Sequence, residues 1–199
     1  MARIRTATIS HCHEKQTPNR ALQRHEAGGQ GLSDPEIDRG FPALWERYVS
    51  ELEGRLVDKP MHTLPAVAEL LSVLGTLEDV ALGLVTGNIA RGARLKLGSA
   101  GLQGYFAVGG YGSDHEERNN LPSIAMQRAR NAWGVDFSAA DAVILGDTPR
   151  DVECGRIEGI RTVAVATGNF GVHDLEAAGA DHTFEDFTDT DRVLEVILD

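Results

Sequence analysis

The chain has 199 residues, enough for one sizeable domain or for a core domain with a small appendage. Its formal net charge of -11 argues against nucleic acid as a main partner, because phosphate backbones attract positive surfaces, but it allows a small phosphorylated ligand. No apolar run approaches the roughly 18 residues that span a membrane, there is no signal-peptide core, and Cys12 and Cys154 form no CxxC motif. We therefore expect a cytoplasmic protein with reduced thiols and no membrane contact.

The first sixty residues differ from the rest in composition and in the pattern of apolar residues, and the change falls near Lys59-Pro60. Residues 1–31 are predicted to be irregular, with a possible strand at 2–9, where ARIRTATI alternates in polarity. A helix is expected from Ser33, because SDPE offers an N-cap, a proline in the first turn and an acid at the third position. A second helix is expected over PALWERYVSELEGRLV, with an apolar stripe formed by Leu44, Tyr48, Leu52 and Leu56.

From Met61 onward the sequence alternates helical segments with short apolar strands. Helices are predicted over 65–77, 90–102, 121–134, 150–159, 176–180 and 190–199, and strands within 80–88, 105–114, 141–148, 161–169 and 181–187. This alternation predicts an α/β fold, a Rossmann-like doubly wound parallel sheet with helices on both faces.

Polar residues follow four of the predicted strands. Because ligands bind at the carboxyl ends of such strands, these residues are expected to face one crevice. They are Thr86-Gly87-Asn88, Ser113-Asp114, Asp147 and Gly168-Asn169.

The segment GDTPRD places two carboxylates, Asp147 and Asp151, one helical turn apart at the end of a buried strand. Mg²⁺ in proteins is usually held by one or two carboxylates, waters and substrate phosphate, so the pair is a candidate metal site. The alternative is that Asp147 caps the following helix and Asp151 is a solvated acid in its first turn.

The segment LVTGN offers the hydroxyl of Thr86, a close backbone approach at Gly87, and Asn88 ahead of a helix N-terminus, which suits a phosphoryl group. An ordinary strand-to-helix turn is the alternative, and a second copy, ATGN at 166–169, shows how common the pattern is. Lys96 and Arg118 are candidate cations, although either could be a solvated surface charge. The tripod-like HCH at 11–13 lies in a loose segment and is not expected to bind metal.

Together, LVTGN, GLQGYF and GDTPRDVECGRIEG resemble the haloacid dehalogenase (HAD) superfamily, in particular its phosphoglycolate-phosphatase-like branch, over residues 61–199. The resemblance implies hydrolysis of a small phosphate ester through an aspartyl-phosphate, with Mg²⁺ as cofactor. It implies that Thr86 hydrogen-bonds the phosphoryl group, with Asn88 beside it and the backbone of Gly87 close by. It also implies that Asp147 holds the metal ion and that Asp151 supports the metal site. Residues 32–60 then resemble the back half of a helical cap.

The sequence departs from the family pattern at two places. RNNLP stands where the family often has KPxP, so the basic role passes to Arg118 or to Lys96, which we favour. The family's DxDGT motif, which supplies the nucleophile and the acid–base aspartate, is absent: ARIRTATI is followed by Ser10-His11, with no carboxylate before Glu14. In this architecture the strands ending at Thr86 and Asp147 flank the central position that the missing strand would fill.

Two functions follow as hypotheses. The chain is a HAD-like phosphatase impaired by the missing motif, or a non-catalytic pseudoenzyme that binds a phosphorylated ligand or a protein. A truncated start and a genuine pseudoenzyme both remain open, as do the substrate and the oligomeric state. A receiver-like phosphoacceptor domain is disfavoured, because it would carry its acids early in the chain and not after a late strand.

Overall fold

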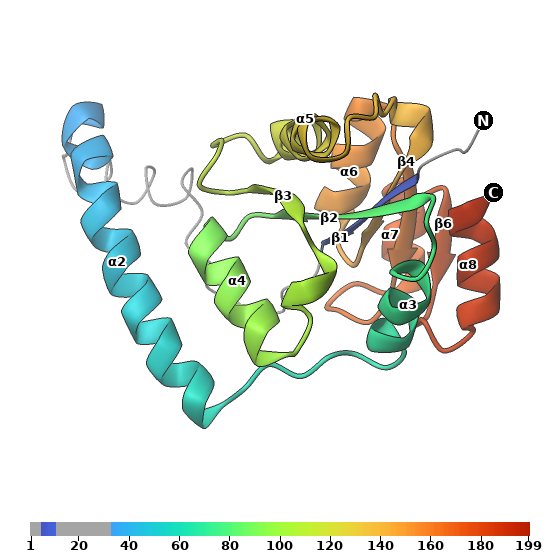
Figure 1. The fold of residues 1–199 in the computed structure, drawn as a ribbon, viewed down its shortest axis with the longest axis horizontal. Helices are drawn as coiled ribbons and strands as arrows, with labels where there is room; N and C mark the ends of the chain where they lie inside the picture. The colour runs from blue at the N-terminus through green and yellow to red at the C-terminus, as the bar shows by residue number, and fades with distance from the viewer. Residues whose placement is uncertain (1–4, 11–32) are drawn as a thin grey trace.

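A computed structural model describes residues 5–10 and 33–199 of the chain (Figure 1). Its centre is a six-stranded sheet in the order β3-β2-β1-β4-β5-β6, in which every neighbouring pair is parallel. The strands are β1 (Arg5–Ser10), β2 (Val80–Thr86), β3 (Val108–Tyr111), β4 (Ala142–Gly146), β5 (Arg161–Val165) and β6 (His182–Phe184). The sheet is therefore the doubly wound α/β type that the alternation predicts.

The helices follow the predicted alternation closely. They are α2 (Asp34–Asp58), α3 (Val67–Leu74), α4 (Ala90–Ser99), α5 (Leu121–Trp133), α6 (Pro149–Glu158), α7 (Val172–Ala177) and α8 (Thr190–Leu198), with short 3₁₀ turns η1 (Gln103–Tyr105), η2 (Arg118–Asn120) and η3 (Ala139–Asp141). No helix of the described ranges combines the length and the apolar character that crossing a membrane requires.

The N-terminal segment supplies the central strand of the sheet. The strand expected at 2–9 is present as β1 at Arg5–Ser10, between β2 and β4, and Ser10 pairs with Gly146. Two neighbours satisfy its backbone groups on both sides, which an isolated buried strand edge could not achieve. Residues 1–4 and 11–32 lie outside the described residues, and with them most of the segment expected to be irregular and the HCH triplet.

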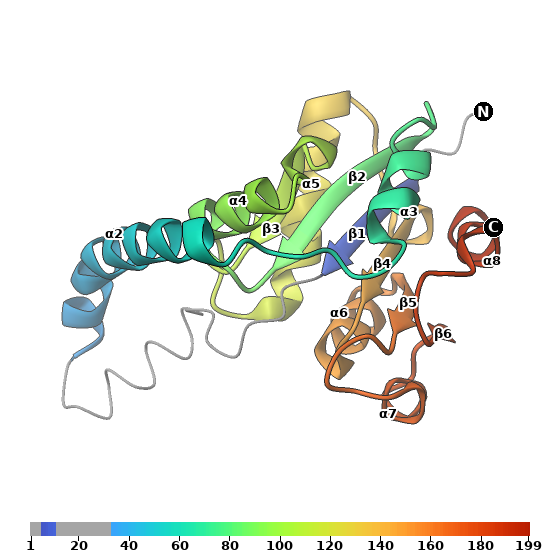
Figure 2. The ribbon, with the colours of Figure 1, turned by 90° about the horizontal axis from the view of Figure 1, so that it is seen from below.

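The alternating side chains of the central strands divide the core into two layers. Val143, Leu145, Val163 and Val165 pack with α3 and α8 in the larger apolar cluster. Ile144 and Ala164 point the other way, toward α6 and α7, and α5 covers β2 and β3 on that side. Figure 2 shows these layers on either side of the strands. Buried on both faces, the strands read as nearly continuous apolar runs.

The two helices expected between Ser33 and Val57 are one, the 25-residue helix α2. Pro42 lies inside it and removes one backbone donor. The apolar side chains nevertheless keep a single helical register across the proline: Ile37, Phe41, Val49 and Leu52 are all buried, and Phe41 stacks on Trp45 with ring centroids 5.5 Å apart. The start at Ser33 is as expected, since its backbone N–H donates to Glu36 at 2.9 Å.

The apolar stripe predicted for this region was partly wrong. Leu44 is 46% exposed, because the helix turns its buried face toward Phe41 and Val49.

A second difference concerns the short helix expected at 176–180, which begins earlier as α7. The reason is local: the carboxylate of Asp174 accepts the N–H of Gly171 at 2.9 Å and caps the first turn.

Candidate functional site

The loop that follows β2 is held by hydrogen bonds from its own residues and from the loop after β3. Thr86 and Asn88 are both buried, and the hydroxyl of Thr86 accepts the Asn88 N–H at 3.2 Å. The N–H of Gly112 donates to the carbonyl oxygens of Thr86 and Asn88, at 2.9 and 2.8 Å. A Cβ at Gly112 would lie 2.0 Å from the carbonyl oxygen of Gly87, so only glycine allows this close contact.

The loop after β4 and the first turn of α6 carry the two buried carboxylates, Asp147 and Asp151, which are 4% and 3% exposed. Thr148 caps α6, and Oδ2 of Asp151 accepts both the N–H and the hydroxyl of Thr148, at 3.2 and 2.8 Å. A Cβ at Gly146 would lie 2.3 Å from Cβ of Asp151. The side chain of Asp151 therefore lies directly on the backbone at the end of β4.

The guanidinium of Arg118 connects the two loops. Its Nη2 donates to Oδ1 of Asp151 at 2.5 Å, and its Nη1 lies 3.1 Å from the position that a Cβ would take at Gly87. Because β1 runs between β2 and β4, the guanidinium spans the carboxyl end of the central strand. Burial by itself would lower the pKa of Arg118, but the carboxylate of Asp151, together with Cys154, raises the pKa overall, so the group stays charged.

A buried thiol lies behind this ion pair. Sγ of Cys154 is 3.1 Å from Oδ1 of Asn119, and burial raises the pKa of the Cys154 thiol to about 11. Nucleophilic cysteines have lowered pKa values, so the neutral thiol of Cys154 fits a packing role rather than a catalytic one.

Lys96, the other candidate cation, is 1% exposed and lies on α4. It lines a small, mostly apolar cavity of about 40 Å³ together with residues 61–64, Leu71 and Leu84. Thr86, Asp147 and Asp151 are not among the residues that line this cavity. The guanidinium of Arg118 lies beside Gly87 and Asp151, at the ends of β2 and β4.

The other two predicted strand ends have different roles. Ser113 accepts the N–H of Ala90 at 3.2 Å and so caps the start of α4. The hydrogen bonds from Arg128 engage Asp114 and raise the pKa of that guanidinium, which fixes the loop after β3. Asn169 is exposed, and within the described ranges no hydrogen bond or ion pair ties it to Asp147, Asp151 or Arg118. Among the described residues, Arg118 joins the ends of β2 and β4, on either side of β1.

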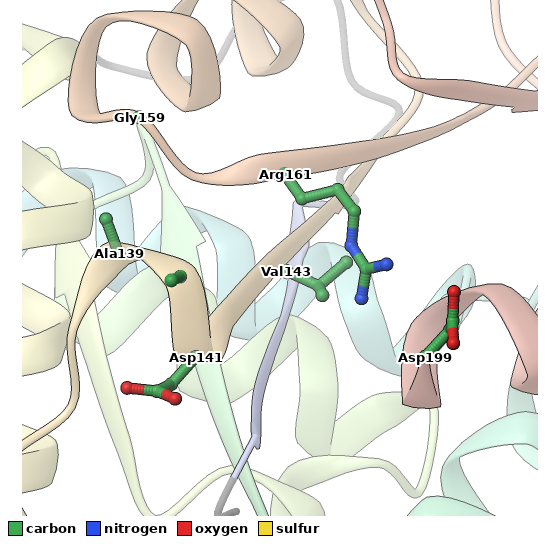
Figure 3. A pocket seen from close by; sticks show the side chains of 7 residues that line it. Ala139, Asp141, Val143, Gly159, Arg161 and Asp199 are labelled. Carbon is green, nitrogen blue, oxygen red and sulfur yellow. The ribbon is translucent and has the colours of Figure 1, made fainter.

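A larger hollow of about 380 Å³ lies elsewhere (Figure 3). Its lining includes Val143 near the start of β4, Arg161 at the start of β5, and Asp199. These are the amino ends of the strands, at the edge of the sheet opposite the polar loops. In open α/β sheets ligands bind at the carboxyl ends, so this hollow is not the candidate site.

The candidate metal ligands among the described residues at the polar edge are Asp147 and Asp151. Within residues 5–10 and 33–199 no three His, Cys, Asp or Glu side chains are grouped as a metal centre. Both oxygens of Asp151 already accept hydrogen bonds, from Arg118 and from Thr148. Asp147 is the other buried carboxylate at this edge.

One residue of this neighbourhood has no signature in the sequence motifs. The hydroxyl of Tyr48, on α2, donates to Oδ1 of Asn88 at 3.3 Å across forty residues of sequence. Tyr48 was placed in the apolar stripe of a helix, and only the packing of α2 on α4 brings it to the loop after β2.

Comparisons with known proteins agree with this fold. Residues 121–190 match the family model described as HAD-hydrolase-like, and no curated protein matches the sequence. A haloacid dehalogenase-like hydrolase from Streptococcus pneumoniae has a TM-score of 0.66 at 14% identity, over 98% of this chain and 100% of that one. A hydrolase from Pseudomonas syringae has a TM-score of 0.64 at 18% identity, over 97% and 99%. A predicted phosphoglycolate phosphatase from Haemophilus somnus has 0.57 at 18% identity, over 81% and 68%.

Proposed function

We propose that this chain, a HAD-like hydrolase by fold and by its family match over residues 121–190, binds a small phosphate ester at the carboxyl edge of the sheet and hydrolyses it weakly. The observation that carries the proposal is the guanidinium of Arg118, which lies between Gly87 and Asp151 across the end of β1. A non-catalytic phospho-ligand-binding protein is the second candidate.

The chemistry of the edge suits a phosphoryl group. Such a group presents only acceptor oxygens and carries negative charge, so it needs hydrogen-bond donors and a nearby cation. Arg118 offers a fixed fork of donors that remains charged. Thr86 and Asn88 add a hydroxyl and an amide on the neighbouring loop, and both side chains are buried from water. In this proposal Arg118 neutralises the phosphoryl charge, because its guanidinium lies beside Gly87 and donates to Asp151 at this edge.

Hydrolysis is expected to be weak because β1 carries no carboxylate. The covalent route of the family needs an aspartate at the end of this strand, and Arg5–Ser10 reads RTATIS. The same observation favours the second candidate. Loss of a nucleophile in another hydrolase lowered turnover by about 10⁶, so near-background rates are the expectation here.

Mg²⁺ is the cofactor that the fold family generally uses, and this site fits it in part. Asp147 would hold the ion, and Asp151, whose oxygens accept hydrogen bonds from Arg118 and Thr148, would support it indirectly. When bound, the ion would help to neutralise the phosphoryl oxygens.

The experiment is a calorimetric titration of orthophosphate and of phosphoglycolate into the purified chain, with and without Mg²⁺. Phosphoglycolate is a reasonable probe because a structural relative is described as a predicted phosphoglycolate phosphatase. We expect saturable binding that Arg118→Met weakens at least tenfold, while Arg47→Met, at a surface ion pair whose arginine is 81% exposed, leaves it unchanged. Absence of saturable binding by the folded wild-type chain would overturn the proposal.

A further inference from the structure

Asn88 is a buried amide with one end engaged and the other end open to a ligand. Its side chain is 1% exposed, and its Oδ1 accepts the hydroxyl of Tyr48 at 3.3 Å. Its Nδ2 has no hydrogen-bond partner among the described residues. Buried polar groups in folded proteins are nearly always paired, so a buried donor without a protein partner, beside Thr86 and Gly87, indicates a place for an acceptor from outside the chain.

The position of Tyr48 is fixed by the packing of α2 on α4, which lie side by side in Figures 1 and 2. A Cβ at Gly92, in the first turn of α4, would lie 2.8 Å from Cε1 of Tyr48 and 3.4 Å from its hydroxyl oxygen. Glycine at this position therefore lets the ring lie on the helix. Beside it, Arg91 and Glu46 form an ion pair that joins the same two helices.

We propose that Tyr48 is a positioning residue, which holds the amide of Asn88 so that Nδ2 donates to a phosphoryl oxygen. The proposal rests on the proposed function of the site. The two ends of an amide point in different directions, so a hydroxyl donating to Oδ1 turns Nδ2 away from α2. The reverse orientation would present the lone pairs of Oδ1 to an anion and repel it. Helix α2 thus determines which end of Asn88 the ligand meets.

The test is orthophosphate binding, measured by calorimetry, for wild type, Tyr48→Phe, Asn88→Ala and the double variant. Loss of one hydrogen bond corresponds to an affinity loss of roughly three- to tenfold, and this is the expected effect of Tyr48→Phe. Asn88→Ala is expected to weaken binding at least as much. If Tyr48 acts through Asn88, adding Tyr48→Phe to Asn88→Ala has no further effect, which an independent structural role would not produce.

Tyr105→Phe is the matched control, because within the described ranges no hydrogen bond is formed by the hydroxyl of Tyr105. Its affinity should equal that of wild type. A wild-type chain that binds no phosphate refutes the proposed function itself. Two other outcomes would refute only the role of Tyr48. In the first, Tyr48→Phe leaves phosphate binding unchanged. In the second, it weakens binding as much in the Asn88→Ala background as in wild type.

A second readout does not depend on the folding of any variant that carries the Tyr48 change. The side-chain amide resonances of Asn88 in wild type, assigned by their loss in Asn88→Ala, should shift as orthophosphate is added. Resonances that stay in place while phosphate binds would contradict the contact between Nδ2 and the ligand.

Discussion

Replacement of Arg118 by methionine should destabilise the fold as well as weaken ligand binding. The change leaves the carboxylate of Asp151, 3% exposed, without its cation. Loss of one partner from a buried ion pair costs about 3–5 kcal/mol. Because the Arg118 side chain is 23% exposed and Thr148 still donates to the carboxylate, we expect the lower end, about 3 kcal/mol. For a chain of this length that corresponds to a melting temperature lower by roughly 6–12 °C.

The assay is urea denaturation followed by circular dichroism, with Arg47→Met as the control. Arg47 pairs with Glu51 on the surface of α2, and such pairs contribute about 0.3–0.5 kcal/mol. Adding Asp151→Asn to Arg118→Met removes the unpaired charge and should recover part of the loss. If Arg118→Met costs no more than Arg47→Met, Arg118 is not paired with a buried carboxylate and the bridge across β1 is wrong.

Three further predictions concern the same edge of the sheet. Gly146→Ala should lower the free energy of unfolding, measured in urea, by about 1–3 kcal/mol, because its Cβ would overlap Asp151. Gly54→Ala, where a Cβ would meet nothing within 4 Å, should instead stabilise α2 by about 0.5–1 kcal/mol, and equal effects of the two changes would contradict the packing. Deletion of residues 1–10 removes the central strand and should abolish cooperative unfolding, so an unchanged melting temperature would exclude β1 from the sheet. The raised pKa of Cys154 keeps the folded thiol neutral from pH 9.0 to about 11, while the unfolded thiol ionises. Stability should therefore fall as the pH rises through that window, and it should fall less steeply in Cys154→Ala. Equal slopes for the two proteins would refute the burial of a neutral Cys154 thiol.

Much of the fold could be predicted because local pattern and global architecture agree. Strand-length apolar runs such as VILG alternate with capped helices, and this leaves few topologies open. The resemblance predicted from GDTPRD agrees with the family model that matches residues 121–190, and the solved HAD-like structures share the fold. The single helix α2 was missed because Pro42 reads as a boundary, whereas the packing of Phe41 and Trp45 carries the helix through it.

The site was harder to predict, since its contacts join residues that are distant in sequence. As the motifs predict, Thr86 ends β2, Asn88 and Asp147 lie in the loops after β2 and β4, and Asp151 lies in the first turn of α6. The pairing of Arg118 with Asp151 depends on how η2 lies against α6, and no spacing in the sequence encodes it. Tyr48 reaches Asn88 only through the docking of two helices.

The most direct test of the central claim follows phosphoglycolate by ³¹P NMR in the presence of the purified chain and Mg²⁺, because one experiment reports both binding and hydrolysis. We predict a resonance that shifts with protein concentration, together with release of orthophosphate close to the rate in buffer. Rapid release of orthophosphate that Asp147→Asn abolishes, or a resonance that the protein does not shift at all, would contradict a site that binds phosphate esters but hydrolyses them weakly.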